Sequence, residues 1–64
     1  MKYVAESIWS EPDKDGKFRI QSDIAVRDDI DECHAWLKGY EGWIKRNNFR
    51  LKGQKIFQIE EVRA

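Results

Sequence analysis

The sequence predicts a small α+β domain in which a short antiparallel β-sheet carries one amphipathic helix on one face. Three observations lead to this fold class. Two segments of alternating apolar and polar residues flank an Asp-Gly turn, one long stretch has helical periodicity, and a final segment alternates again. The order of these segments is ββαβ, or ββαββ if the last one is split. We expect residues 1–64 to form a single domain, because a chain of this length builds only one small core.

The first two segments predict a β-hairpin. Residues 2–10 carry apolar side chains on both faces, which indicates that the second face is not simply exposed to solvent. One face holds Val4 and Ile8, and the other holds Tyr3, Ala5 and Trp9. Asp15-Gly16 is a strong hairpin turn signal. In residues 18–26 we expect the apolar side chains to face the core and the polar ones to face solvent. The apolar set is Phe18, Ile20, Ile24 and Val26, and the polar set is Arg19, Gln21 and Asp23.

The helical stretch runs from Asp28 to about Asn48 and holds the only Cys and the only His. Asp28 and Asp29 are suitable N-caps, and the Asn47-Asn48 pair tolerates the left-handed conformation that ends a helix. Gly39 weakens the middle of the helix, so a bend or an early end there is the alternative to one continuous helix. At 100° per residue a buried stripe forms from Ile30, Cys33, Leu37, Tyr40 and Ile44.

The final segment, residues 49–62, returns to a strand pattern that Gly53 divides. Gly53 marks either a bulge in one long strand or part of a tight turn between two short strands. We favour the turn, because Leu51 and Ile56 would then pair across it.

Composition narrows the cellular setting and the class of function. A single cysteine excludes an intrachain disulfide and favours a reducing compartment. The chain has no apolar run long enough for a signal peptide or a membrane span, so we expect a cytoplasmic protein without a membrane partner. Residues 1–32 carry a formal charge of −4 and residues 33–64 carry +4, a polarity that can orient a partner or favour self-association.

No set of residues predicts catalysis, a metal ion or a cofactor. The acidic hairpin turn resembles the start of a calcium-binding EF-hand loop, but Ser22 stands where the bidentate Glu should be. Cys33 and His34 point about 100° apart on a helix and have no second Cys or His at ligand spacing. We expect Cys33 to be a small buried side chain and His34 to be a surface residue, and we expect no enzyme activity.

Aromatic residues supply the main functional prediction, which is binding of another protein, with a homodimer as one form of it. Three tryptophans exceed what a small core needs, and such residues are favoured interface anchors. The alternative is that they only enlarge the core. The predicted protein-binding residues are Trp9, Trp36, Gly39, Tyr40 and Trp43. Gly39 also belongs, with Ala35 and Gly42, to a strip of small residues that would admit another backbone.

A basic cluster at the helix C-terminus and the following strand predicts an alternative function, the binding of nucleic acid. Its members are Lys45, Arg46, Arg50, Lys52 and Lys55. Zero net charge and the lack of a recognised nucleic-acid motif weigh against it. The size and ββαβ layout resemble small accessory proteins of phages and mobile elements, including inhibitors of host defence enzymes. We therefore expect a non-catalytic inhibitor or adaptor.

Overall fold

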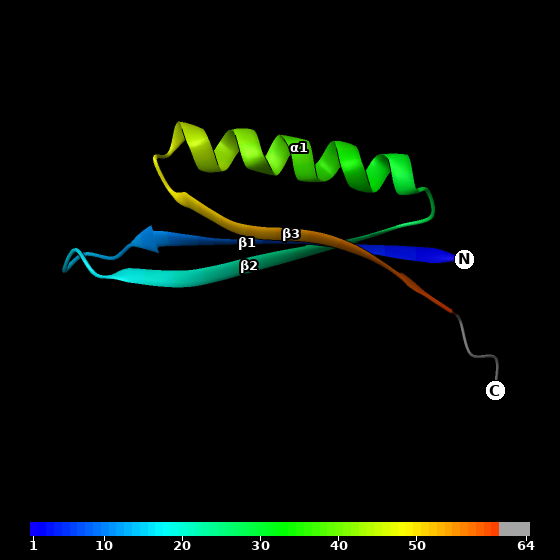
Figure 1. The fold of residues 1–64 in the computed structure, drawn as a ribbon, viewed down its shortest axis with the longest axis horizontal. Coiled ribbons are helices and arrows are strands. Elements are labelled where there is room, and N and C mark those ends of the chain that lie inside the picture. The colour runs from blue at the N-terminus through cyan, green and yellow to red at the C-terminus, as the bar shows by residue number, and fades with distance from the viewer. Residues whose placement is uncertain (61–64) are drawn as a thin grey trace.

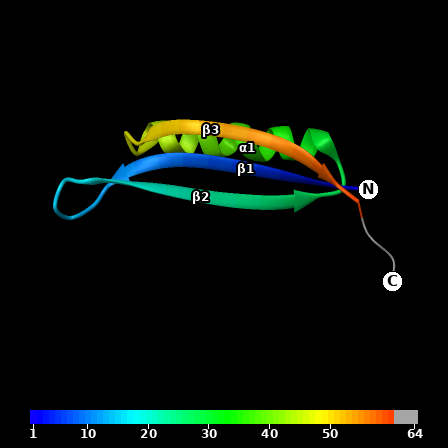
Figure 2. The same cartoon turned by 60° about the horizontal axis from the view of Figure 1, so that its bottom comes forward.

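The chain folds as a three-stranded antiparallel sheet with one helix on one face (Figure 1). This computed structural model describes residues 1–60. The elements are β1 (Lys2–Pro12), β2 (Phe18–Arg27), α1 (Ile30–Arg46) and β3 (Arg50–Ile59). The strand order is β2-β1-β3, so β1 is the central strand, as Figure 2 shows. The predicted α+β class and the ββαβ order are confirmed.

The β1–β2 hairpin is regular from Tyr3 opposite Arg27 to Pro12 opposite Phe18. Its turn extends past the end of the helix (Figure 1). Gly16 has a φ of 78°, a left-handed conformation that costs a glycine little, as the Asp-Gly signal predicts.

The helix is continuous from Ile30 to Arg46 and shows no early end at Gly39. Asp29 caps it by accepting a hydrogen bond from the Asp31 N–H at 2.8 Å. At the other end Asn48 has a φ of 59°, the left-handed conformation expected of this Asn pair. One residue of the predicted buried stripe, Ile30, is not buried. Ile30 is the first residue of the helix and remains 42% exposed, because a helical side chain leans over the preceding turn and there is none at this position.

The core lies between the helix and the odd-numbered residues of β1. Ala5, Cys33 and Leu37 form its buried centre. Around it pack the partly buried side chains of Tyr3, Trp36 and Ile56. Gln54 of β3 joins helix and sheet by donating hydrogen bonds to the Leu37 carbonyl at 2.9 Å and to the Ser7 hydroxyl at 3.3 Å. Small residues in the centre of β1 allow the helix to lie close to the sheet.

The last strand corrects the prediction of a turn at Gly53. β3 is one strand that pairs with β1 along its length, and its register shifts between Ile8 and Trp9. Ile8 pairs with Gly53 and Trp9 with Leu51, so Lys52 is the extra residue of a β-bulge. Pairing with the full length of β1 stabilises one long strand, and local sequence signals do not report that long-range partner.

The facing of β2 is opposite to the prediction. Ala25 pairs with Ala5, which lies under the helix, so the odd-numbered residues of β2 face the helix. The predicted inward residues Phe18, Ile20, Ile24 and Val26 therefore lie on the opposite face, and the polar Arg19, Gln21 and Asp23 share the helix side. Alternation shows which residues share a face but does not show which face the helix covers.

Candidate protein-binding face

The uncovered side of the sheet is a continuous apolar surface, which we call the open face. Figure 1 shows the helix on one side of the strands, and no helix or strand of residues 1–60 lies on the other. Six large apolar side chains of the open face are exposed. They are Phe18 (54%), Ile20 (64%), Ile24 (56%), Val26 (44%), Phe57 (45%) and Ile59 (37%). Val4 and Ile8 of the central strand lie among them, and Val4 is buried by its neighbours.

The extent of the open face sets it apart from scattered surface hydrophobics. Together the six exposed fractions amount to about three whole side chains, or on the order of 600 Å² if a large apolar side chain offers about 200 Å². The largest apolar patch on a typical monomer is about 300–600 Å² and is often functional. The open face is therefore at the upper end of what an isolated domain exposes.

Few charges interrupt the open face: Glu6 lies at the middle of the central strand, beside Ile24, and Lys55 and Arg50 come from β3. Lys55 forms an ion pair with Glu6 at 3.1 Å, and its Nζ lies 5.8 Å from the centre of the Phe57 ring. The Arg50 guanidinium lies 4.9 Å from the centre of the Phe18 ring. The β2 side of the face carries Phe18, Ile20, Ile24 and Val26, with Ser22 between them.

The predicted aromatic residues form one cluster between helix and sheet, on the side opposite to the open face. Tyr40 is at its centre, with ring centroids 5.0 Å from Trp9, 4.8 Å from Trp36 and 5.5 Å from Trp43. Trp43 also contacts Phe49 at 5.5 Å. Trp9 is 6% exposed and its indole N–H has no acceptor among residues 1–60, whereas Trp43 is 38% exposed. Of the three tryptophans, Trp43 therefore offers the most surface to a partner.

Tyr40 also links the helix to the edge strand β2. Its hydroxyl donates a hydrogen bond to the Asp23 carboxylate at 3.0 Å. Burial raises the pKa of Tyr40 from 10.0 to about 12, and the hydrogen bond to Asp23 and the negative charges of Asp23 and Glu11 act in the same direction. Gly39 lies one residue away on the exposed side of the helix, with open space around it.

The predicted basic cluster is divided between two sides of the sheet. Lys45, paired with Glu41 at 2.9 Å, and Arg46 are on the last turn of the helix. Arg50 and Lys55 are on the open face, and Lys52 is the bulged residue of β3. The structure therefore does not bring the five side chains together.

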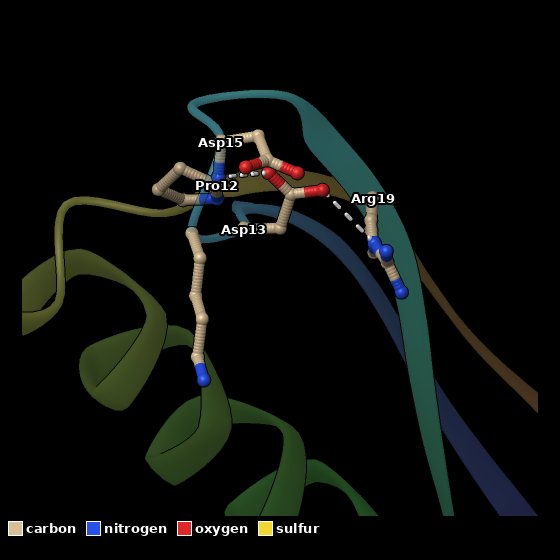
Figure 3. A pocket seen from close by; sticks show the side chains of 5 residues that line it. Pro12, Asp13, Asp15 and Arg19 are labelled. Atoms are coloured by element: carbon tan, nitrogen blue, oxygen red, sulfur yellow. Dashed lines mark hydrogen bonds and ion pairs between the residues drawn. The ribbon is translucent and has the colours of Figure 1, made fainter.

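The hairpin turn contains a shallow hollow of about 440 Å³ (Figure 3). Asp13 organises it by accepting hydrogen bonds from the Asp15 N–H at 2.9 Å, the Lys17 N–H at 3.0 Å and the Arg19 side chain at 3.1 Å. Burial raises the pKa of Asp13, but the hydrogen bonds from Lys17, Asp15 and Arg19 outweigh it and leave the pKa below its usual value. These hydrogen bonds fix the shape of the turn. They also occupy the Asp13 carboxylate, the group that would have to bind a metal ion.

Cys33 and His34 lie as predicted, the thiol fully buried and the imidazole exposed. Within residues 1–60 no group of three or more His, Cys, Asp or Glu side chains is placed to hold a metal ion. In the same part of the chain, no helix combines the length and apolarity needed to cross a membrane.

Comparisons with protein families, with curated proteins and with solved structures found no match to this chain.

The open face is the feature that sequence reasoning missed. A signal for it was present, because Val4 and Ile8 make the first strand apolar on both faces. The prediction places the four apolar residues of β2 under the helix. Ala5 and Trp9 of β1 already provide apolar side chains on that face of the sheet.

Proposed function

We propose that this chain is a non-catalytic protein-binding module and that the open face is its binding site. The observation that carries the proposal is the gathering of six exposed large apolar side chains on one uncovered sheet face. The charges within this face are few, and Glu6 and Lys55 neutralise each other in an ion pair at 3.1 Å, so most of the surface that a partner would cover is apolar.

The size of the face is sufficient for binding. Removing on the order of 600 Å² of apolar surface from water contributes about 15 kcal/mol at 25 cal/mol per Å². The loss of translational and rotational freedom on association costs about 4–15 kcal/mol. The gain exceeds the cost over most of this range and equals it at the upper end, so affinity depends on how completely a partner covers the face.

Within this proposal we assign the aromatic cluster a supporting role. Trp9, Trp36 and Tyr40 hold the helix on the sheet, and Trp43, the most exposed of the three tryptophans, adds a contact at the margin. An inhibitor or adaptor of a host protein is the form of this function that the analogy with small phage-type accessory proteins favours. Such a protein acts by covering a surface and needs no reactive group.

The test is affinity capture with the tagged chain from cells of its native host. Ile20 and Ile24 are replaced together by lysine, and His34→Lys, at an exposed position of the helix, is the control with a single added charge. We expect the wild type and His34→Lys to retain the same protein, or the same untagged copy of this chain, and the double variant to lose it. Circular dichroism verifies that the double variant is folded. A folded double variant that captures the protein as well as the wild type refutes the assignment of the open face.

A second candidate function, binding of single-stranded nucleic acid, rests on one specific arrangement. Arg50 and Lys55 lie beside the exposed rings of Phe18 and Phe57, and a cation next to an aromatic platform is how such proteins hold a phosphate and stack a base. The aliphatic side chains that dominate the open face fit it less well. Fluorescence anisotropy of a labelled oligonucleotide tests it, with binding that falls steeply with salt and with Arg50→Gln expected if it holds.

A further inference from the structure

The open face belongs to the outer surface of a chain with a very small core. The buried hydrophobic residues include Ala5, Ala25 and Cys33, which contribute little volume, while larger residues such as Ile20 and Ile24 stay exposed. A domain of 64 residues buries a smaller fraction of its surface on folding than a larger domain does, and it gains stability from association. A second layer on the open face would therefore add a second core.

We infer that the occupant of the open face is a second copy of this chain, packed face to face to form a helix–sheet–sheet–helix homodimer. The inference rests on the proposed function and names its partner. Two antiparallel sheets pack with their inner faces about 10 Å apart and their strands within about 30° of each other. Each copy has one helix-covered face and one open face, so two copies complete the sandwich.

The area available agrees with what a stable dimer needs. Two open faces of on the order of 600 Å² each give about 1,200 Å² of buried apolar surface, at the lower end of the standard interface size of about 1,200–2,000 Å². The polar groups at the margin add to this figure. A two-fold dimer uses the same patch twice, so no other surface of the chain is required.

The distribution of charge favours an interface centred on β2. On the open face β2 itself contributes four large apolar side chains and Ser22, and the charged side chains belong to the neighbouring strands, with Glu6 of β1 beside Ile24. Lys55 of β3 neutralises Glu6, and the Arg50 guanidinium lies against Phe18 at the hairpin end of β2, so both cations lie away from Ser22, toward the margin of such a dimer. With a two-fold axis across β2 near Ser22, the Ile20 end of one strand faces the Ile24 end of the other.

Sedimentation velocity over a range of concentrations tests the inference on the wild type, the Ile20→Lys/Ile24→Lys double variant and the His34→Lys control. We expect the wild type and the control to dimerise and the double variant to associate at least about 100-fold more weakly, because each lysine replaces a buried anchor with a charge. Both isoleucines are more than half exposed, so the fold tolerates the changes. A dimer that survives both lysines lies elsewhere, for example along the strand edges, and overturns the inference.

A second measurement uses cross-linking and does not depend on disrupting the dimer. Ser22→Cys places a thiol at the expected axis, and His34→Cys places one on the exposed side of the helix, while the native Cys33 is fully buried. A short bismaleimide should join two Ser22→Cys chains and leave His34→Cys and the wild type as single chains. Equal cross-linking of the two variants overturns the proposed packing.

The outcomes separate this inference from the proposed function. A wild type that stays monomeric at all concentrations overturns the homodimer. If affinity capture still yields a different protein that the double variant loses, the open face remains a binding site for that protein. If capture also shows no dependence on Ile20 and Ile24, both proposals fail. An oligonucleotide that binds the monomer through Arg50 supports the second candidate function and overturns the homodimer.

Discussion

The hydrogen bond between Tyr40 and Asp23 makes a quantitative prediction about stability at high pH. It connects the helix to β2, and replacing Tyr40 by Phe removes the hydroxyl while keeping the ring that packs on Trp9 and Trp36. The pKa of Tyr40 rises from 10.0 to about 12 in the folded protein. Because the folded state favours the neutral phenol, this contribution to stability is fully present below pH 10 and is lost as the pH rises toward 12.

The magnitude follows from the shift. Two pKa units correspond to at most about 2.7 kcal/mol. The hydroxyl lies near the surface, where solvent screens the charge of Asp23, so we expect about 1 kcal/mol. The net value of a typical intramolecular hydrogen bond is also about 1 kcal/mol.

Urea unfolding of the wild type and Tyr40→Phe, at neutral pH and above pH 10, measures this contribution. At neutral pH we expect the variant to be less stable by about 1 kcal/mol, since it lacks the hydrogen bond. The difference should shrink above pH 10, where the wild-type phenol begins to ionise. Comparing the wild type with Tyr40→Phe at the same pH cancels the effect that titration of the lysines has on the free energy of unfolding. A difference that is constant across the whole range refutes the reasoning.

Three other predictions concern single positions. Gly39→Ala should raise the free energy of unfolding by about 0.5–1 kcal/mol in urea titrations, because the helix is continuous there and an added Cβ meets open space. A loss of stability would show that the position has a contact we have not identified. Gly16→Ala should lower the free energy of unfolding by about 1 kcal/mol, since a φ of 78° disfavours a side chain, and an unchanged midpoint would contradict this turn geometry. The Cys33 thiol should react with a thiol reagent only as fast as the protein unfolds, and rapid labelling of the native protein would show that it is not buried.

Local rules predicted the parts of this fold that local geometry decides. Asp29 accepts a backbone hydrogen bond at the helix start, and Asn48 and Gly16 adopt left-handed conformations where the chain must reverse or end an element. Each depends on a few neighbouring residues. The continuity of the helix through Gly39 shows where a propensity argument is insufficient, since packing of Leu37 and Ile44 on the sheet stabilises both halves.

The parts that the sequence did not reveal depend on long-range pairing. Gly53 is compatible with a turn or a bulge, and only pairing with β1 decides between them. The proposed binding site depends on long-range pairing in the same way. The pairing of Ala5 with Ala25 puts small residues under the helix, so Ile20 and Ile24 point away from it. The alternation of apolar residues in β2 is equally compatible with either face of the strand lying under the helix.

The placement of large and small apolar residues connects the fold to the proposed function. If the chain were adapted to stand alone, the isoleucines of β2 would be expected under the helix, where Ile56 of β3 already packs against the core. Instead, Trp9 and Tyr40 fill that space with aromatic rings, alanine and serine line the rest of β1, and the β2 isoleucines occupy the uncovered side. The aromatic cluster is therefore sufficient to hold the helix on the sheet without the open face. A surface that the monomer does not need for its own packing, yet keeps apolar at the expense of solubility, is best explained by a second protein layer on it.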